Sequence, residues 1–236
     1  MSKPYIDKFH LQGGELIRQV TFGMNDGIVS IFALLAGIAG AGQSPKTILI
    51  SLLAATIAGA LSMAAGEFIS GKGEHEYYKH EIEQERLEIK LCPDIEKEEI
   101  RIIYRKKGFE GDILEEIVDK IIQNEDLWVR EMIIEELGVT EIEQAPGIKT
   151  SIIIFFSFIM GALFPVLPYL ILFQTSLIEM TLFWIATGIT FGGLFLAGAL
   201  KTFVTGISWL KSGVEMLFVG LFAFGISYLI GYFIPI

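Results

Sequence analysis

Five long stretches with at most one charged residue limit what this chain can fold into more than any other feature of its sequence. Residues 47–66, 150–178, 180–200 and 216–236 carry no charged side chain, and Asp26 is the only ionisable residue between Arg18 and Lys46. Each stretch is near or above the ~20 residues that a helix needs to cross the hydrocarbon core of a bilayer. The sequence therefore predicts an all-α membrane protein with five transmembrane helices.

One hydrophilic segment carries the whole net charge of the chain. Residues 72–149 hold 22 acidic and 12 basic side chains, the remainder holds six of each, and the net charge is −10. Such a segment repels nucleic acid and attracts cations, so a nucleic-acid partner is not expected. Its apolar residues recur at helical spacing, which predicts an acidic domain of about three helices inserted between spans 2 and 3.

Proline and glycine set the expected boundaries. Span 2 meets no proline before Pro93, so its helix is expected to continue past the membrane to about Leu91. The expected parts of the chain are 1–71 with the N-terminal segment and spans 1 and 2, 72–149 with the acidic domain that continues the span 2 helix, and 150–236 with spans 3 to 5.

Local signals refine these helices. Inside the acidic domain we expect helices over residues 94–107, 112–123 and 125–137, with Asp94 as the N-cap of the first. In span 3, Pro165 and Pro168 are expected to break or kink the helix, because proline lacks a backbone donor. The expected core of the acidic domain consists of apolar side chains at helical spacing: Ile102, Ile103, Leu114, Ile117, Val118, Ile121, Leu127 and Ile133.

The distribution of lysine and arginine predicts the orientation in the membrane. With five spans, the N-terminus, the acidic domain and the loop between spans 4 and 5 share one side, which carries every basic residue except Lys46. Basic residues concentrate on the cytosolic side of membrane proteins. The N-terminus and the acidic domain are therefore expected in the cytosol, and the C-terminus outside the cell or in a lumen.

Asp26, Met63 and Glu67 are the candidate functional residues of the spans. A charged side chain inside a membrane segment costs about 2.5–3.5 kcal/mol, which makes Asp26 a functional candidate, although it can also snorkel or cap a helix. A hairpin of spans 1 and 2 can bring the Met63 thioether to the Asp26 carboxylate, and Glu67 follows Met63 by one helical turn. The structural alternatives are that Met63 only fills space among apolar side chains and that Glu67 only contacts solvent near the cytosolic end of its span. Either carboxylate can also take up a proton.

The acidic domain repeats pairs of possible metal ligands, each on one helix face. The pairs are Glu85 with Glu88, Glu96 with Glu99, and Met132 with Glu136. Three packed helices can converge these side chains on one or more divalent ions, with the methionine adding sulfur. The alternative is a solvated acidic bundle whose glutamates pair with nearby cations: Arg86, Lys90, Arg101 and Arg105.

Signatures of catalysis are missing from the sequence. His75 and His80 are five residues apart, which turns them away from the single face that a zinc-protease HExxH helix requires. The sequence also has no glycine-rich phosphate loop before a lysine and no GxSxG motif. An enzyme is therefore not expected, and a transporter without a nucleotide site has to run on an ion gradient.

Five segments together resemble the vacuolar iron transporter family, which includes plant and protist vacuolar iron transporters and the yeast calcium-cross-complementer homologue. The segments are FGMNDGIVSIFALLAG at 22–37, SMAAGEFIS at 62–70, the glutamate-rich insertion, WVREMIIEELGV at 128–139 and GALFPVLPY at 161–169. The resemblance implies a homodimer with five spans per subunit. It also implies export of Fe²⁺, and often of Mn²⁺ or Co²⁺, from the cytosol to a vacuole or the exterior in exchange for protons.

The resemblance also implies roles for individual residues. Asp26 and Met63 would form the translocation site, with Glu67 nearby. The cytosolic domain would bind metal through five glutamates and one methionine: Glu85, Glu88, Glu96, Glu99, Met132 and Glu136. No tightly bound cofactor is implied, since Fe²⁺, Mn²⁺, Co²⁺ and Zn²⁺ would be substrates.

Two expectations stay open between alternatives. The short chain favours a prokaryotic member of the family in the plasma membrane, whereas a eukaryotic member would lie in the vacuolar membrane. The alternative function is a membrane-anchored divalent-metal sensor or buffer without transport, in which the spans only tether the acidic domain to the lipid.

Overall fold

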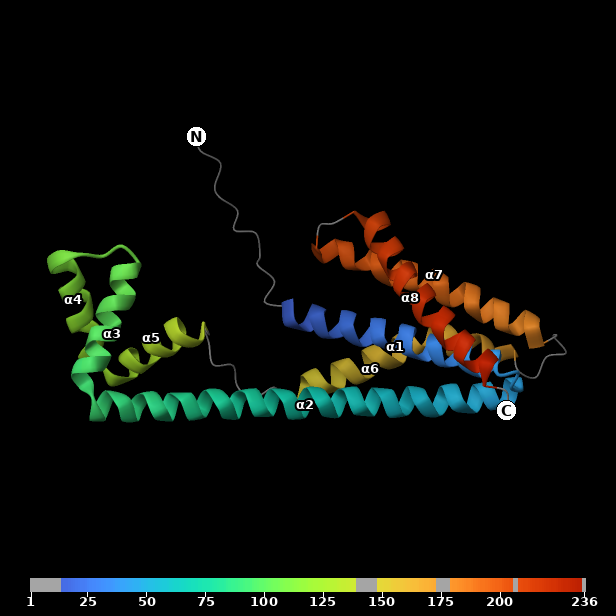
Figure 1. The fold of residues 1–236 in the computed structure, drawn as a ribbon, viewed down its shortest axis with the longest axis horizontal. Coiled ribbons are helices and arrows are strands. Elements are labelled where there is room, and N and C mark those ends of the chain that lie inside the picture. The colour runs from blue at the N-terminus through green and yellow to red at the C-terminus, as the bar shows by residue number, and fades with distance from the viewer. Residues whose placement is uncertain (1–13, 139–147, 173–178, 206–207, 235–236) are drawn as a thin grey trace, which may run out of the picture. The chain divides into compact units, whose positions relative to one another are not determined.

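Every regular element that the structure describes is a helix. The computed structural model describes residues 14–138, 148–172, 179–205 and 208–234, and over these residues it contains no strand (Figure 1). The helices are α1 (Gly14–Gly40), α2 (Pro45–Leu91), α3 (Pro93–Lys106), α4 (Gly111–Ile122), α5 (Glu125–Leu137), α6 (Ile148–Leu172), α7 (Glu179–Thr205) and α8 (Trp209–Phe233). The predicted all-α class is confirmed.

Five of these helices are long and apolar enough to cross a membrane. They are α1, α2, α6, α7 and α8, in the order that the uncharged stretches predict. A helix satisfies its backbone donors and acceptors within itself, which hydrocarbon requires because it offers no water as a partner. The predicted number of spans is therefore confirmed, and α3, α4 and α5 lie between the second and third spans in the sequence.

The described residues form two compact units, with α2 contributing to each. The first unit holds the described residues up to Phe68 and those from Ile148 on. Within it α1 packs against α6, α7 and α8, and its core includes Phe32, Phe158 and Tyr169 (Figure 1). The second unit holds the described residues from Ile69 to Gly138.

Glycines allow α1 to contact its neighbours backbone to backbone. A Cβ at Gly161 of α6 would collide with the carbonyl oxygen of Met24 on α1, and one at Gly27 would collide with the carbonyl oxygen of Phe158 on α6. Farther along α1, a Cβ at Gly231 of α8 would meet the Gly37 carbonyl. Small residues permit this close approach in membrane helices, and the contacts fix the helix that carries Asp26.

The second unit packs around residues that the helical pattern identifies only in part. Leu114, Val118, Ile121 and Ile133 are buried as predicted, and Ile103 and Ile117 are partly buried. The prediction is wrong for Ile102 and Leu127, which are exposed. The core also contains buried residues that the prediction omits: Ile89, Ile100, Trp128, Val129 and Met132.

Helix ends in the second unit follow two local rules. The Asn124 side chain caps α5 by accepting a hydrogen bond from the Leu127 backbone N–H, and Gly138 ends this helix in the left-handed conformation. The predicted Asp94 N-cap is wrong, because Pro93 takes the first helical position and Cys92 becomes the cap residue. Proline fits there, since the N–H it lacks would have no helical partner.

The helix α6 is continuous through Pro165 and Pro168, and both prolines are buried. Of the predicted break or kink, the break does not occur, and the kink stays a prediction. An interruption would leave additional backbone groups without partners in an apolar environment, so an unbroken helix is the lower-energy solution.

Gly161→Ala should destabilise the first unit, because the new methyl group meets backbone atoms of α1 that cannot rotate away. The expected loss is about 1–3 kcal/mol, as for overpacked cores. Thermal unfolding in detergent measures it. Gly188→Ala on α7 is the matched control, since its Cβ meets open space. Equal unfolding temperatures for both variants would contradict the close α1–α6 contact.

Candidate metal sites

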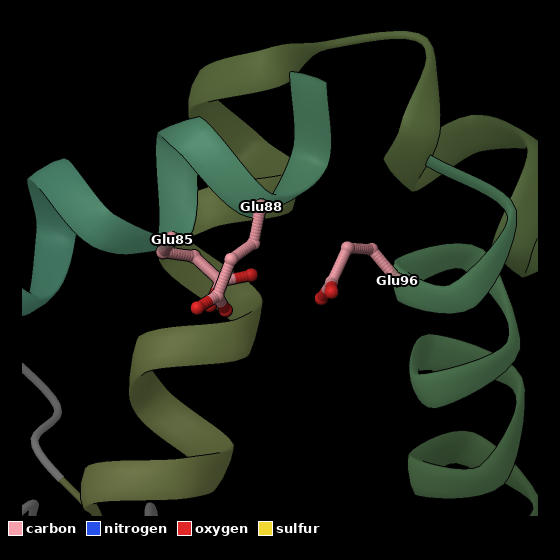
Figure 2. A group of neighbouring side chains, drawn as sticks. All are labelled: Glu85, Glu88 and Glu96. Carbon is pink, nitrogen blue, oxygen red and sulfur yellow. The ribbon is translucent and has the colours of Figure 1, made fainter. Parts of the chain in front are cut away.

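Three glutamate side chains converge in the second unit. The carboxylates of Glu85 and Glu88 on α2 and of Glu96 on α3 each offer an oxygen, and these oxygens lie within 4.8 Å of one another. Figure 2 shows the three side chains pointing toward a common point from the two helices. The reversal at Cys92 and Pro93 creates this arrangement, because it ends α2 one turn after Glu88 and starts α3 just before Glu96.

Two of the three carboxylates are buried and have an oxygen without a hydrogen-bond partner among the described residues. Glu85 is 4% exposed and Glu96 is 6% exposed. One oxygen of each, Oε1 of Glu85 and Oε2 of Glu96, has no hydrogen-bond partner among the described residues. Burying an ionised carboxylate without a partner is costly, so these groups need either a proton or a bound cation.

Two further glutamates, Glu99 and Glu136, also repel the buried carboxylate of Glu85. Burial raises the pKa of Glu85 to about 8, and the negative charges of Glu136, Glu96, Glu88 and Glu99 add to this rise. Burial, followed by repulsion from neighbouring carboxylates, also raises the pKa of Glu96 and of Glu136. All five glutamates named from the sequence therefore lie in one group, in which the other four act on Glu85. We call these five residues the glutamate cluster.

Several basic side chains of the second unit pair with acids outside the cluster. Arg101 contacts Glu98 and Glu115, and further pairs are Lys72 with Glu76, Arg86 with Glu125 and Asp126, Lys90 with Glu125, Lys97 with Asp119, and Lys107 with Glu135. No ion pair recorded for the described residues includes a member of the glutamate cluster. This arrangement disfavours the alternative of a bundle whose glutamates are neutralised by arginine and lysine.

Met132 is fully buried among the apolar side chains of the second unit. It lies on α5 one helical turn before Glu136, as the sequence spacing requires. A buried methionine in this position fills the core whether or not its sulfur also binds metal. Its role as a ligand stays a prediction.

The chemistry of the cluster suits a divalent cation. Carboxylate oxygens are hard ligands that bind Mg²⁺, Ca²⁺, Mn²⁺ and Fe²⁺, and several can share one ion. A bound ion would supply the positive charge that the buried oxygens of Glu85 and Glu96 lack. The described residues thus contain an acidic cluster with the right atoms and no recorded ion pair to any of its glutamates.

The candidate residues of the first unit lie on two helices. Asp26 is exposed on α1, while Met63 on α2 is partly buried and packs against the apolar core. Glu67 is also partly buried, and its Oε1 accepts a hydrogen bond of 2.8 Å from Nε2 of Gln19 on α1. The pairing of Asp26 with Met63 around a metal stays a prediction.

Sequence reasoning missed Gln19. This residue is 2% exposed and precedes Asp26 by seven positions, which places both on the same face of α1. An amide in an otherwise apolar stretch is a detectable signal, because such a group needs a hydrogen-bond partner when it is buried.

Comparison with known proteins gives a family match over most of the chain. Residues 17–232 match the VIT family. A vacuolar iron transporter 1 of Oryza sativa subsp. japonica is 32% identical over 93% of this chain and 85% of its own length. The vacuolar iron transporter 1 of Arabidopsis thaliana is 30% identical over 91% and 84%, and the vacuolar iron transporter of Plasmodium falciparum is 29% identical over 91% and 81%.

Chelated protein should lose stability in the second unit as the pH rises. The pKa of Glu85 is about 8 in the folded state against an ordinary value of 4.5, so between these values the folded state keeps a proton that the unfolded chain has lost. The contribution of Glu85 to the free energy of unfolding is therefore greatest below about pH 4.5 and is lost as the pH rises to about 8. Added Mn²⁺ should restore it, because the metal replaces the proton.

This pH effect is measured by chemical unfolding in EDTA, followed by the fluorescence of Trp128 after Trp184 and Trp209 are replaced by phenylalanine. Glu85→Gln, which cannot ionise, should flatten the dependence. Glu116→Gln is the control, since Glu116 is exposed on α4 outside the cluster. A pH profile of Glu85→Gln identical to that of the parent protein would contradict the uncompensated burial of Glu85.

Proposed function

This chain belongs to the VIT family, and on that premise we propose that it exports divalent metal, chiefly Fe²⁺, from the cytosol. The observation that carries the proposal is the group formed by Glu85, Glu88 and Glu96. It holds buried carboxylate oxygens without partners in a chain with five membrane helices. A protein of this kind is an integral membrane transporter rather than an enzyme.

The glutamate cluster, with Met132, collects metal for transport. Its oxygens attract any divalent ion, and the charge of the cluster raises the local concentration of cations. A sulfur ligand shifts preference toward Fe²⁺, Mn²⁺, Co²⁺ and Zn²⁺ over Mg²⁺ and Ca²⁺. These ions are substrates, so the proposal includes no tightly bound cofactor.

Asp26, Met63 and Glu67 form the translocation site. A carboxylate and a thioether within the spans select the same borderline metals as the cluster does. The carboxylates also provide groups that exchange metal for protons, since a proton can replace the ion after its release. Proton antiport follows from this exchange and from the lack of a nucleotide-binding motif in the sequence.

The distribution of lysine and arginine supports one orientation of the chain in the membrane. The second unit lies in the cytosol as an insertion between spans 2 and 3, together with the N-terminus. Export then moves metal to the exterior if the chain lies in a plasma membrane, or into a vacuole if it lies in a vacuolar membrane.

A second copy of the chain completes the transporter. In the first unit, α2 presents apolar side chains at helical spacing that no other described helix covers: Ile50, Leu53, Ile57 and Leu61. Pairing about a twofold axis would cover such a face and place two copies of Asp26 and Met63 in one assembly. Lipid is the competing partner of this surface, because a bilayer also covers apolar side chains.

A sensor or buffer is the competing function. It is favoured by the second unit, which has its own core and its own candidate metal site. The two functions differ in one result, because a sensor binds metal at the cluster but moves none across the membrane.

Purified protein in liposomes should move Fe²⁺ or Mn²⁺ under a pH gradient, and Asp26→Asn should reduce this flux about tenfold or more, corresponding to about 1.4 kcal/mol of lost interaction. A metal-sensitive dye reports the metal, and a pH dye reports proton movement in the opposite direction. Glu215→Gln on α8 is the matched control, because it removes a carboxylate from another span without touching the site. Metal binding without flux would favour the sensor, and full flux in Asp26→Asn would exclude the translocation site.

A further inference from the structure

A groove between α2 and α6 lies at one end of these two membrane helices, within the first unit. Its volume of about 560 Å³ falls in the range of ~300–1,000 Å³ that is usual for ligand sites. Ser151 is the only polar residue among the described residues that line it. Its apolar walls include Ala64, Ala65 and Phe68 of α2 and Ile152 and Phe156 of α6.

The groove is open because α2 does not pack along α6 as α1 does. The helices α1 and α6 meet backbone to backbone at Gly27 and Gly161, whereas no extended contact of this kind joins α2 to α6 among the described residues. At Gly59, α2 instead faces the ring of Phe158. Side chains that line an unfilled space lose attractive contacts, so an apolar chain that enters the groove is stabilised there.

The hydroxyl of Ser151 is a donor that the chain leaves unused. Ser151 is 6% exposed, and its Oγ has no hydrogen-bond partner among the described residues. On the same helix, Ser157 donates to the carbonyl oxygen of Ile153 at 2.8 Å. A buried hydroxyl without a partner is costly, and Ser151 borders the groove. It can therefore donate to an acceptor that comes from outside the chain.

A basic side chain stands beside the groove at the end of the span. Lys149 is exposed and is the second residue of α6. It precedes Ile152 and Phe156 by three and seven residues, which places it on the same helix face as these two groove residues. Lysine at a membrane boundary attracts acidic lipid headgroups.

Glu67 does not oppose this attraction from inside the groove. Its Oε1 accepts a hydrogen bond from Gln19 on α1, and Glu67 is not among the residues that line the groove.

The order of these groups along α6 matches the order of parts in a glycerophospholipid. From the interior of the span toward its end, α6 presents the apolar Phe156 and Ile152, then the Ser151 hydroxyl, then the Lys149 cation. A glycerophospholipid presents an acyl chain, then ester oxygens, then a phosphate. This match favours a lipid over a second copy of the chain, although Leu61 at the edge of the groove also belongs to the α2 face proposed for pairing.

We propose that the groove between α2 and α6 binds one acidic glycerophospholipid of the surrounding bilayer. Its acyl chain lies against Ile152 and Phe156, the Ser151 hydroxyl donates to an ester carbonyl oxygen, and Lys149 pairs with the phosphate. The lipid thereby ties α2 to α6 where the two helices do not pack closely. This site goes beyond the proposed function and does not depend on transport.

Binding is tested by native mass spectrometry of the full chain in detergent, titrated with dioleoyl phosphatidylglycerol. Dioleoyl phosphatidylcholine, which has the same acyl chains and no net charge, should bind less tightly. Lys149→Gln should weaken binding of the acidic lipid about fivefold. Ser151→Ala should weaken it roughly two- to tenfold, as for the loss of one hydrogen bond. Ala65→Trp fills the groove and should abolish tight binding.

Two matched controls should bind the acidic lipid as the parent protein does. Lys211→Gln removes a charge from the first turn of another span, α8. Ser157→Ala removes a hydroxyl of α6 that already has a partner. Equal binding of the two lipids by the parent, or binding that Ser151→Ala or Ala65→Trp leaves unchanged, would overturn the proposal.

The same spectra report how many copies of the chain associate. If Ala65→Trp separates the copies and keeps the lipid, the groove is an interface between copies and the proposal is wrong. Thermal unfolding provides a second measurement that does not need the tryptophan variant to fold. Phosphatidylglycerol should raise the unfolding temperature of the parent and of both controls more than that of Ser151→Ala and Lys149→Gln, and equal shifts would contradict the lipid site.

Discussion

The burial of carboxylates without a counter-charge is the constraint on which the rest of the second unit depends. Glu85 and Glu96 have little contact with solvent, and each keeps an oxygen without a partner among the described residues. The cations of the same unit neutralise other acids, as Arg101 does with Glu115. The protein thus carries a local electrostatic cost that a proton or a divalent ion must remove, which connects the stability of this unit to its ligand.

A helix start and contacts between helices position these acidic side chains. Pro93 starts α3 immediately after α2 ends, which brings Glu96 to the carboxylates of Glu85 and Glu88. In the first unit, backbone contact at Gly161 fixes α1 against α6, and a hydrogen bond from Gln19 ties α1 to α2. Each unit therefore holds its acidic groups on helices whose contacts fix their place within that unit.

The sequence predicts the helices better than it predicts their contacts. Apolar stretches identify the five spans, because a charged side chain is costly anywhere along a helix that lies in hydrocarbon. Pro93 correctly predicts where α2 ends. Periodicity shows that Glu85 and Glu88 share a face but not that Glu96 approaches them, since that proximity depends on how α3 packs. The Asp94 cap failed because proline competes for the same turn. The sequence does not predict a role for Gln19, because its hydrogen-bond partner Glu67 lies 48 residues away.

The most direct measurement of the central claim is anomalous scattering from crystals of the full chain grown with Mn²⁺. The account predicts a peak bounded by the carboxylates of Glu85, Glu88 and Glu96, which should weaken or vanish in Glu96→Gln and remain in Glu98→Gln. Saturating Mn²⁺ without a peak at these three residues, or an undiminished peak in Glu96→Gln, would contradict the claim that the three carboxylates bind a divalent cation.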